Sequence, residues 1–253
     1  TYTRPMKFIG IIPARYASSR FPGKPLAMID GKPMIVRVAE RAESALDEVV
    51  VATDDERIAA CCADHGHRAI MTSADHRSGT DRCREALDLS GSAADVVINI
   101  QGDEPFIDPR QIRQLAGCFE ADPSTEIATL VRRFDPALGW DALFNPNTPK
   151  VELDLRGNAL MFSRSIIPYV RSHPWQEWIA TTTFYTHVGM YGYRSSTLRE
   201  ITRLPQSPAE IAESLEQLRW LQNGYRIATA VTDIPTVGID TPDDLARALA
   251  MMK

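Results

Sequence analysis

"KFIGIIPARYASSRFPGKPL", residues 7–26, joins two stretches of opposite character. Residues 7–13 are almost entirely apolar, which predicts a strand buried on both faces of a sheet. The remainder combines glycine, serines and prolines with three cations, Arg15, Arg20 and Lys24. A buried strand that ends in a charged, glycine-containing loop indicates an α/β protein with a polar site at the carboxyl end of the strand.

The same alternation continues through the first 135 residues. Strands are predicted at 7–13, 48–53, 68–72, 95–100 and 127–133, and amphipathic helices at 34–46, 55–66, 80–89 and 109–121. Strands that alternate with helices in this way are typical of a mostly parallel sheet covered by helices. The fold class is therefore predicted as α/β.

The pattern changes from about residue 136. Residues 150–163 alternate with a period of two around "RGN", which predicts an antiparallel hairpin. Residues 173–194 are rich in aromatic residues and indicate an irregular lobe or an oligomer contact, with Trp175 and Trp178 either as interface anchors or as core residues. A helix at 209–224, a strand at 225–232 and a helix from 243 return to the first pattern.

The composition excludes several classes of protein. The chain has 253 residues, a net charge of −5 and 44% hydrophobic residues, which is typical of a soluble globular protein. A mildly acidic chain without a basic tract argues against nucleic acid as a partner, and the apolar runs are shorter than the roughly 20 residues of a membrane span. Residues 1–7 lack the apolar stretch of a secretory signal, so we expect a cytoplasmic protein. The four cysteines show no paired spacing and are expected to be reduced thiols.

Four polar loops are predicted at one edge of the sheet. They cover residues 14–26, 72–82, 101–106 and 237–244, and each follows an apolar strand. The cations of the first loop suit a polyphosphate, although an ordinary solvated loop has the same composition. This loop is not a P-loop, because Pro25 follows Lys24, and no GxGxxG follows the strand.

Two acids lie in different loops of this set. Asp103 and Asp240 would together offer carboxylate oxygens to Mg²⁺, which is commonly held by one or two carboxylates plus phosphate oxygens. Asp240 could equally belong to a helix N-terminus, and Asp103 to a turn. Spacing alone leaves these alternatives open.

The motifs resemble those of a known family. The matching blocks are "IIPARYASSRFPGKPL" (11–26), "DHRSGTDR" (75–82), "VVINIQGDEPFI" (96–107), "HVGMYGYR" (187–194), "LEQLRWLQNG" (215–224) and "GIDTPDDL" (238–245). In this order they resemble the 3-deoxy-manno-octulosonate (Kdo) cytidylyltransferases, or CMP-Kdo synthetases, from about Lys7 to Leu249. The segment 170–186 departs from the family pattern.

The resemblance implies an enzyme that joins CTP to Kdo and releases pyrophosphate, giving CMP-Kdo for bacterial lipopolysaccharide synthesis. It implies a Rossmann-like nucleotidyltransferase sheet, a Mg²⁺ cofactor and a homodimer. The nucleotide-binding portion would be residues 1–135, an antiparallel sugar-binding and dimerisation lobe would be 136–205, and residues 206–253 would return to the α/β portion within one continuous catalytic domain.

The resemblance also implies roles for individual residues. The metal ligands would be Asp103 and Asp240, and the catalytic residues would be these two with Lys24 and Arg15. The nucleotide would be bound by Ala14, Arg15, Arg20, Lys24, Ser78, Gly79 and Gln101. The sugar acid would be bound by Gln101, Arg164, His187, Tyr191, Glu216 and Gln217.

Without the resemblance, several of these residues have ordinary structural interpretations. His187 would be a hydrogen-bonded structural histidine, Tyr191 a core residue, and Glu216 and Gln217 part of a solvated helix face. Rival functions are a cytidylyltransferase for sialic acid or an amino-substituted Kdo, a nucleotide-sugar glycosyltransferase, and a non-catalytic CTP sensor. The glycosyltransferase is disfavoured because residues 102–105 read Gly-Asp-Glu-Pro and not Asp-x-Asp.

Overall fold

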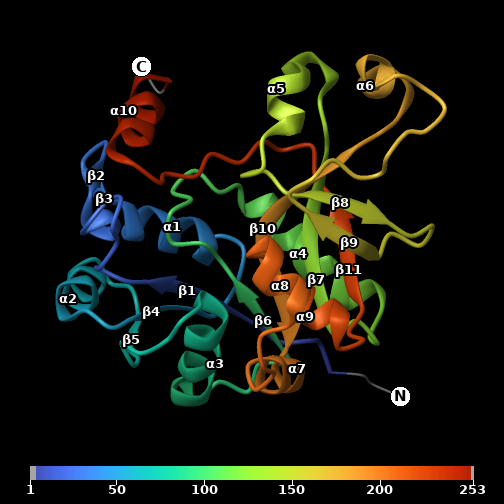
Figure 1. Cartoon of the computed structure of the whole chain (residues 1–253). Coiled ribbons are helices and arrows are strands. Elements are labelled where there is room, and N and C mark those ends of the chain that lie inside the picture. Colours follow the sequence, from blue (N-terminus) through green and yellow to red (C-terminus); the bar gives the residue numbers. More distant parts are fainter. Residues whose placement is uncertain (1–3, 252–253) are drawn as a thin grey trace.

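A nine-stranded mixed sheet with helices on both faces forms the centre of the fold (Figure 1). The computed structural model describes residues 4–251, so the ends of the portions predicted at 1–135 and 206–253 lie outside the described residues. The strands are β1 (Phe8–Ala14), β4 (Val49–Thr53), β5 (Ala69–Met71), β6 (Val96–Asn99), β7 (Ile127–Arg133), β8 (Lys150–Leu153), β9 (Ala159–Ser163), β10 (Tyr185–Arg194) and β11 (Ile227–Val231). A separate small sheet pairs β2 (Met28–Ile29) with β3 (Lys32–Pro33).

Ten α-helices are described, together with three short 3-10 turns. The helices are α1 (Met34–Glu43), α2 (Glu56–Asp64), α3 (Gly79–Ser90), α4 (Pro109–Ala121), α5 (Gly139–Phe144), α6 (Trp178–Thr181), α7 (Ser195–Ile201), α8 (Pro208–Glu213), α9 (Gln217–Gln222) and α10 (Pro242–Met251). The turns are η1 (Lys24–Leu26), η2 (Pro136–Leu138) and η3 (Trp175–Glu177). The predicted α/β class is confirmed.

The strand order is β11-β7-β10-β6-β1-β4-β5, with the β8–β9 hairpin joined to the end of β10. Strands β6, β1, β4 and β5 are parallel to one another, as are β7 and β11. Strand β10 lies between β6 and β7 and is antiparallel to both. The sheet is therefore parallel except where β10 and the hairpin enter it.

Each face of the sheet buries its own apolar core. Helices α1, α2 and α4 cover one face, and helices α3, α7 and α9 cover the other. All five residues of β4 are buried, as expected for a parallel strand covered on both faces. A smaller cluster joins β2 and α1 to the last helix, because Ile29 and Met34 pack with Ile239 and with Ala248 of α10.

Two predictions about the second half of the chain need correction. The helix expected at 209–224 is broken into α8 and α9 by Ser214, whose backbone is left-handed at φ 51°. The guanidinium of Arg164 binds the carbonyls of Glu213 and Ser214, which compensates for the helical hydrogen bonds lost at the break. Strand β10 falls within the lobe expected at 136–205, yet it lies in the main sheet because it pairs on both sides.

Helices α5 and α6 of the 136–205 segment project beyond the sheet, as Figure 1 shows, whereas the β8–β9 hairpin belongs to the sheet and α7 packs on one of its faces. Trp178 is buried with Phe134, Leu143 and Phe184, so the interpretation of this tryptophan as a core residue is confirmed. Trp175 is half exposed and contacts the rings of neighbouring aromatic residues.

Two further expectations concern the whole chain. All four cysteines are free thiols, and Cys62 and Cys83 are buried among apolar side chains. No helix within residues 4–251 has the length and apolar character needed to cross a membrane.

Gly192 provides a test of how tightly β10 packs. A Cβ atom at this position would lie 2.5 Å from Cε2 of Phe119, a buried ring on α4. We expect Gly192→Ala to lower the free energy of unfolding by about 1–3 kcal/mol, because the overpacked core must shift. Urea unfolding followed by circular dichroism measures this change.

Gly189 is a matched control on the same strand, because a Cβ there would have no neighbour within 4 Å. Gly189→Ala should change the free energy of unfolding by less than about 1 kcal/mol. Equal destabilisation by the two variants would contradict the packing argument.

Candidate active site

The four polar loops predicted at one edge of the sheet meet in a single cleft. The cleft is lined by Pro13, Ala14, Arg15, Ser18, Arg20, Lys24 and Pro25 from the first loop, by His76, Arg77, Ser78, Gly79 and Arg82 from the second, by Gln101, Gly102 and Asp103 from the third, and by Asp240 from the fourth. These loops follow the carboxyl ends of β1, β5, β6 and β11. Such an edge is where open α/β sheets bind their ligands.

Glycine is required where the first and third loops approach each other. A Cβ on Gly102 would lie 2.8 Å from the backbone carbonyl oxygen of Pro13, closer than real Cβ contacts come. The third loop can therefore lie against the end of β1 only if this residue has no side chain. This close approach brings Asp103 next to the cationic loop.

The cationic loop carries its charge into the cleft. Gly23 has a left-handed backbone at φ 69° and begins η1, of which Lys24 is the first residue. The Lys24 ammonium donates to Asp103 at 2.9 Å and to the carbonyl of Ile239 at 2.9 Å. Arg20 forms an ion pair of 3.3 Å with Asp240.

The two acids predicted as metal ligands lie around one cation in this structure. The Lys24 nitrogen is 2.9 Å from a carboxylate oxygen of Asp103 and 3.8 Å from one of Asp240. Within residues 4–251, no group of three or more histidine, cysteine or acidic side chains is placed to hold a metal ion. Two carboxylates are the kind of oxygen ligands that Mg²⁺ takes, with its remaining ligands from water and phosphate, and here Lys24 lies between them.

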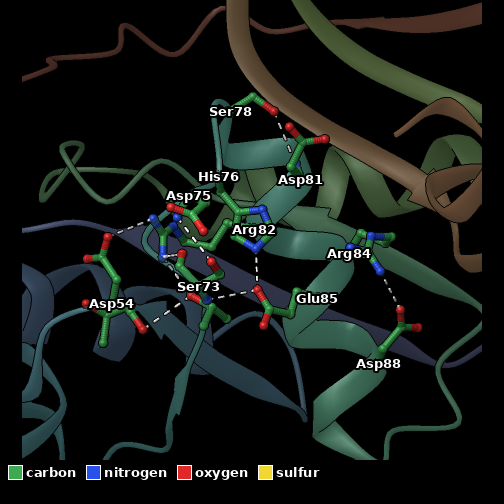
Figure 2. A network of polar contacts seen from close by, with 12 residues as sticks. Asp54, Ser73, Asp75, His76, Ser78, Asp81, Arg82, Arg84, Glu85 and Asp88 are labelled. Carbon is green, nitrogen blue, oxygen red and sulfur yellow. Dashed lines mark hydrogen bonds and ion pairs between the residues drawn. The ribbon is translucent and has the colours of Figure 1, made fainter. Parts of the chain in front are cut away.

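The second loop is held by side chains of the helix that follows it (Figure 2). Arg82, on α3, donates to the Thr72 hydroxyl at 2.6 Å and to the Ser73 carbonyl at 3.2 Å. Its guanidinium also pairs with Asp54, after β4, at 3.1 Å. Because Arg82 is buried, this pair fixes the loop relative to the end of β4.

Glu85 ties the same loop one helical turn further along α3. Its carboxylate accepts from the Ser73 N–H at 3.0 Å and contacts the His76 ring, as Figure 2 shows. Ser78 then caps α3, since its hydroxyl accepts from the Asp81 N–H at 3.1 Å. Ser78 and Gly79 are thus presented to the cleft by a loop that is anchored on both sides.

His187 and Tyr191 lie together on β10, with their rings 5.3 Å apart. The Thr129 hydroxyl is 2.7 Å from the Met190 carbonyl and 2.9 Å from Nε2 of His187. Since a hydroxyl has one proton and the carbonyl can only accept, Thr129 donates to Met190 and accepts from His187. This assigns the Nε2–H tautomer and leaves Nδ1 of His187 as a hydrogen-bond acceptor.

Glu216 and Gln217 lie at the start of α9, beside α3. The Glu216 carboxylate accepts from the Thr80 hydroxyl at 2.8 Å, and burial raises its pKa. Gln217 is buried. Glu216 also lines a second cavity, which shares Arg77 and Ser78 with the cleft.

Arg164 lies on the other side of the α8–α9 break. Its guanidinium is held by the carbonyls of Pro146, Glu213 and Ser214, at 2.5 to 3.1 Å. Of the residues implied for the sugar acid, Gln101 alone lines the main cleft. Of the others, His187 and Tyr191 are in ring contact, Tyr191 packs on Trp220 of α9, and Glu216 bonds to Thr80 of α3.

Several residues of the site were missed by sequence reasoning. Glu85 was counted only as a member of a helix, and Arg82 was included in the polar loop 72–82 without a role of its own, although a charged residue at a core-facing position such as Arg82 was a usable signal. Asn99 is buried next to Tyr191 in the sheet, and its Oδ1 lacks a hydrogen-bond partner among the described residues. Burial and the neighbouring Asp103 raise the pKa of Glu104 to about 7.

The fold is thus an α/β sheet with a cleft at the strand ends, in which a cationic loop and two acids face each other. The chain belongs to the cytidylyltransferase family, whose model matches residues 9–227.

Individual relatives are similar over almost the full chain. The 3-deoxy-manno-octulosonate cytidylyltransferase of Parabacteroides distasonis is 57% identical over 248 residues, which cover 98% of each chain. The protein of the same name from Porphyromonas gingivalis is 53% identical and covers 97% of this chain and 96% of its own.

Solved structures agree with these relatives. A CMP:2-keto-3-deoxy-manno-octonic acid synthetase in complex with CTP has a TM-score of 0.89 at 44% identity, over 97% of this chain and 98% of its own. A cytidylyltransferase from Leptospira borgpetersenii, at 17% identity and a TM-score of 0.60 over 95% of this chain and 84% of its own, shares the fold.

His187 gives the site a measurable pH signature. Burial lowers its pKa to about 4, against about 6.5 in the unfolded chain. Between pH 6.5 and pH 4 the histidine is protonated in the unfolded state and neutral in the folded state. The contribution of this group to stability is therefore present above pH 6.5 and is lost as the pH falls toward 4. We expect the wild-type protein to lose about 2 kcal/mol of unfolding free energy from this group between pH 7 and pH 5.

His187→Gln tests this expectation, because it removes the buried imidazole. His173→Gln is the control, because it removes a histidine that is exposed. Urea unfolding at pH 7, 6 and 5 should show a shallower pH dependence for His187→Gln, and a wild-type dependence for His173→Gln. A wild-type slope in His187→Gln would rule out a buried neutral imidazole.

Proposed function

We propose that this protein transfers CMP from CTP to the anomeric hydroxyl of Kdo, giving CMP-Kdo and pyrophosphate. The observation that carries this proposal is the match, at 57% identity over 98% of both chains, to a 3-deoxy-manno-octulosonate cytidylyltransferase. The CTP complex of the structural neighbour supports CTP as the nucleotide. In bacteria that make lipopolysaccharide, the product would supply activated Kdo, and the cytoplasm, which contains CTP, would be the location.

The reaction is an in-line displacement at phosphorus. The anomeric hydroxyl oxygen of Kdo forms a bond to the α-phosphorus of CTP, and the bond from that phosphorus to the bridging oxygen breaks. Pyrophosphate leaves with the bond's electrons, and the hydroxyl proton passes to solvent. Such a transfer depends on positioning and charge neutralisation more than on a covalent nucleophile.

The residues of the cleft have matching roles in this proposal. Arg15, Arg20 and Lys24 neutralise the triphosphate and the charge that grows on the leaving pyrophosphate. Ser78 and Gly79, held by the α3 network, contact the cytosine. Asp103 and Asp240 would hold Mg²⁺, which when bound would supply positive charge to the α-phosphate and to the sugar carboxylate.

On the sugar side, Nδ1 of His187 accepts a hydrogen bond from a hydroxyl of Kdo, because its Nε2–H is already donated to Thr129. Gln101, Tyr191, Glu216 and Gln217 add polar contacts to the polyhydroxylated acid. Arg164 provides positive charge for the substrate carboxylate. Sialic acid and amino-Kdo are the alternative substrates, and no feature of the site favours them.

The function is tested by pyrophosphate release from CTP with a panel of acceptors. Purified protein with CTP and Mg²⁺ should release pyrophosphate with Kdo, and more slowly or not at all with sialic acid. Mass spectrometry of the product should give CMP-Kdo. Absence of turnover with Kdo, or release of a nucleoside diphosphate, would overturn the assignment.

Asp103→Asn should lower kcat by at least about a hundredfold while leaving the melting temperature close to that of the wild type. The substitution removes the charge of a metal ligand but little volume, and even indirect disturbance of a metal site costs 10–100-fold. Asp141→Asn, at an exposed acid on α5, is the matched control and should keep wild-type activity. Near-normal turnover of Asp103→Asn at saturating Mg²⁺ would contradict the role of Asp103.

We also propose a homodimer formed through the projecting part of the chain that contains α5, η3 and α6. Its support is a cluster of aromatic rings at the tip, in which Trp140, Phe144 and Trp175 contact one another. Phe144 is 52% exposed and Trp175 47% exposed, which is unusual for side chains of this size unless a partner covers them.

Trp175→Ala should shift the protein from dimer toward monomer in analytical ultracentrifugation, because a large apolar anchor is lost from the contact. Leu155→Ser removes an exposed apolar side chain from the tip of the β8–β9 hairpin instead, and should leave the association unchanged. Sedimentation of the wild-type protein as a monomer at all concentrations would refute the proposed dimer.

A further inference from the structure

The ammonium of Lys24 lies among the oxygen atoms that a divalent cation would use. It is 2.9 Å from Asp103 Oδ2, 3.8 Å from Asp240 Oδ1 and 2.9 Å from the Ile239 carbonyl oxygen. Its side chain is only 16% exposed, so the charge is largely shielded from water. The internal cation and both predicted metal ligands therefore form one compact cluster.

The backbone holds this cluster together. The N–H of Ile239 donates to the carbonyl of Asp103 at 2.9 Å, which joins the third and fourth loops directly. Lys24 enters from the first loop, on the turn that Gly23 begins. Three loops that are distant in the sequence thus meet at one charged nitrogen, and Arg20 adds a second positive charge at Asp240, at 3.3 Å.

The charges of this cluster determine how a metal ion can bind to it. Two neighbouring carboxylates repel each other, and a cation between them offsets that repulsion. A divalent ion bound to both acids would meet the Lys24 ammonium at close range, and two like charges in a poorly hydrated site strongly oppose each other. Lys24 must therefore move away before the metal can bind both carboxylates.

We propose that Lys24 is a displaceable internal cation. Before a metal ion binds, it helps to hold Asp103 and Asp240 in place, and it competes with the metal for them. When a triphosphate is present, its oxygens offer the ammonium a second anionic partner, so metal and nucleotide favour each other's binding. This inference rests on the proposed function for its nucleotide, but its central claim concerns the metal alone.

Arg20 provides a matched comparison within the same loop. It also carries one positive charge and contacts Asp240, at 3.3 Å. Its side chain is 66% exposed, and among the described residues its ion pair is with Asp240 and not with Asp103. A surface pair of this kind is well screened by water, so removal of Arg20 should affect metal binding far less than removal of Lys24.

The test measures Mn²⁺ binding without nucleotide, by the electron paramagnetic resonance signal of free Mn²⁺. We expect Lys24→Gln to bind Mn²⁺ about tenfold or more tightly than the wild type, because loss of the competing charge favours the divalent ion. Arg20→Gln should remain within about threefold of the wild type. Thermal unfolding and near-ultraviolet circular dichroism verify that each variant is folded.

A double variant, Lys24→Gln with Asp103→Asn, identifies the site that is measured. It should lose the gain in Mn²⁺ affinity if the ion binds at these carboxylates. Unchanged or weaker binding by Lys24→Gln, an equal gain in Arg20→Gln, or a gain that survives in the double variant would each overturn the proposal. None of these outcomes bears on whether CTP and Kdo react, so failure here is distinguishable from failure of the proposed function.

Discussion

The hydrogen bonds on both edges of β10 are the constraint on which the rest of the structure depends. Without this strand, the parallel strands β6, β1, β4 and β5 would have no connection through the sheet to β7 and β11. The loop with Asp103 follows one of these groups and the loop with Asp240 follows the other. The antiparallel strand between the groups thus sets the spacing of the two acids, and it also carries His187 and Tyr191.

The parallel part of the fold was predictable because each element has a local signal. The strands are continuous apolar runs and the helices show a period of 3.6, so β1, β4, β6, β7 and α4 lie close to their predicted positions. The convergence of the four loops followed from the rule that the carboxyl ends of parallel strands lie at one edge of the sheet. The place of β10 did not, because pairing with two distant strands leaves no mark within residues 185–194.

The same limit applies within the site. The cations of the first loop are visible in the sequence as a charged cluster, and the cleft contains all three. The anchoring of the second loop by Arg82 and Glu85 is tertiary, since Arg82 pairs with Asp54 from another strand end. The break at Ser214 is also tertiary. The carbonyls of Glu213 and Ser214 accept hydrogen bonds from Arg164, which is distant in the sequence, instead of from helical N–H groups.

The cluster of Ile29, Met34, Ile239 and Ala248 couples the position of the last helix, α10, to that of the loop that carries Asp240. Asp240 lies between Ile239 and α10. Its carboxylate therefore keeps its position only while α10 stays packed on β2 and α1. Proteolytic trimming, an affinity tag or a fusion partner at the carboxyl end would accordingly disturb the position of Asp240 and leave the sheet itself intact.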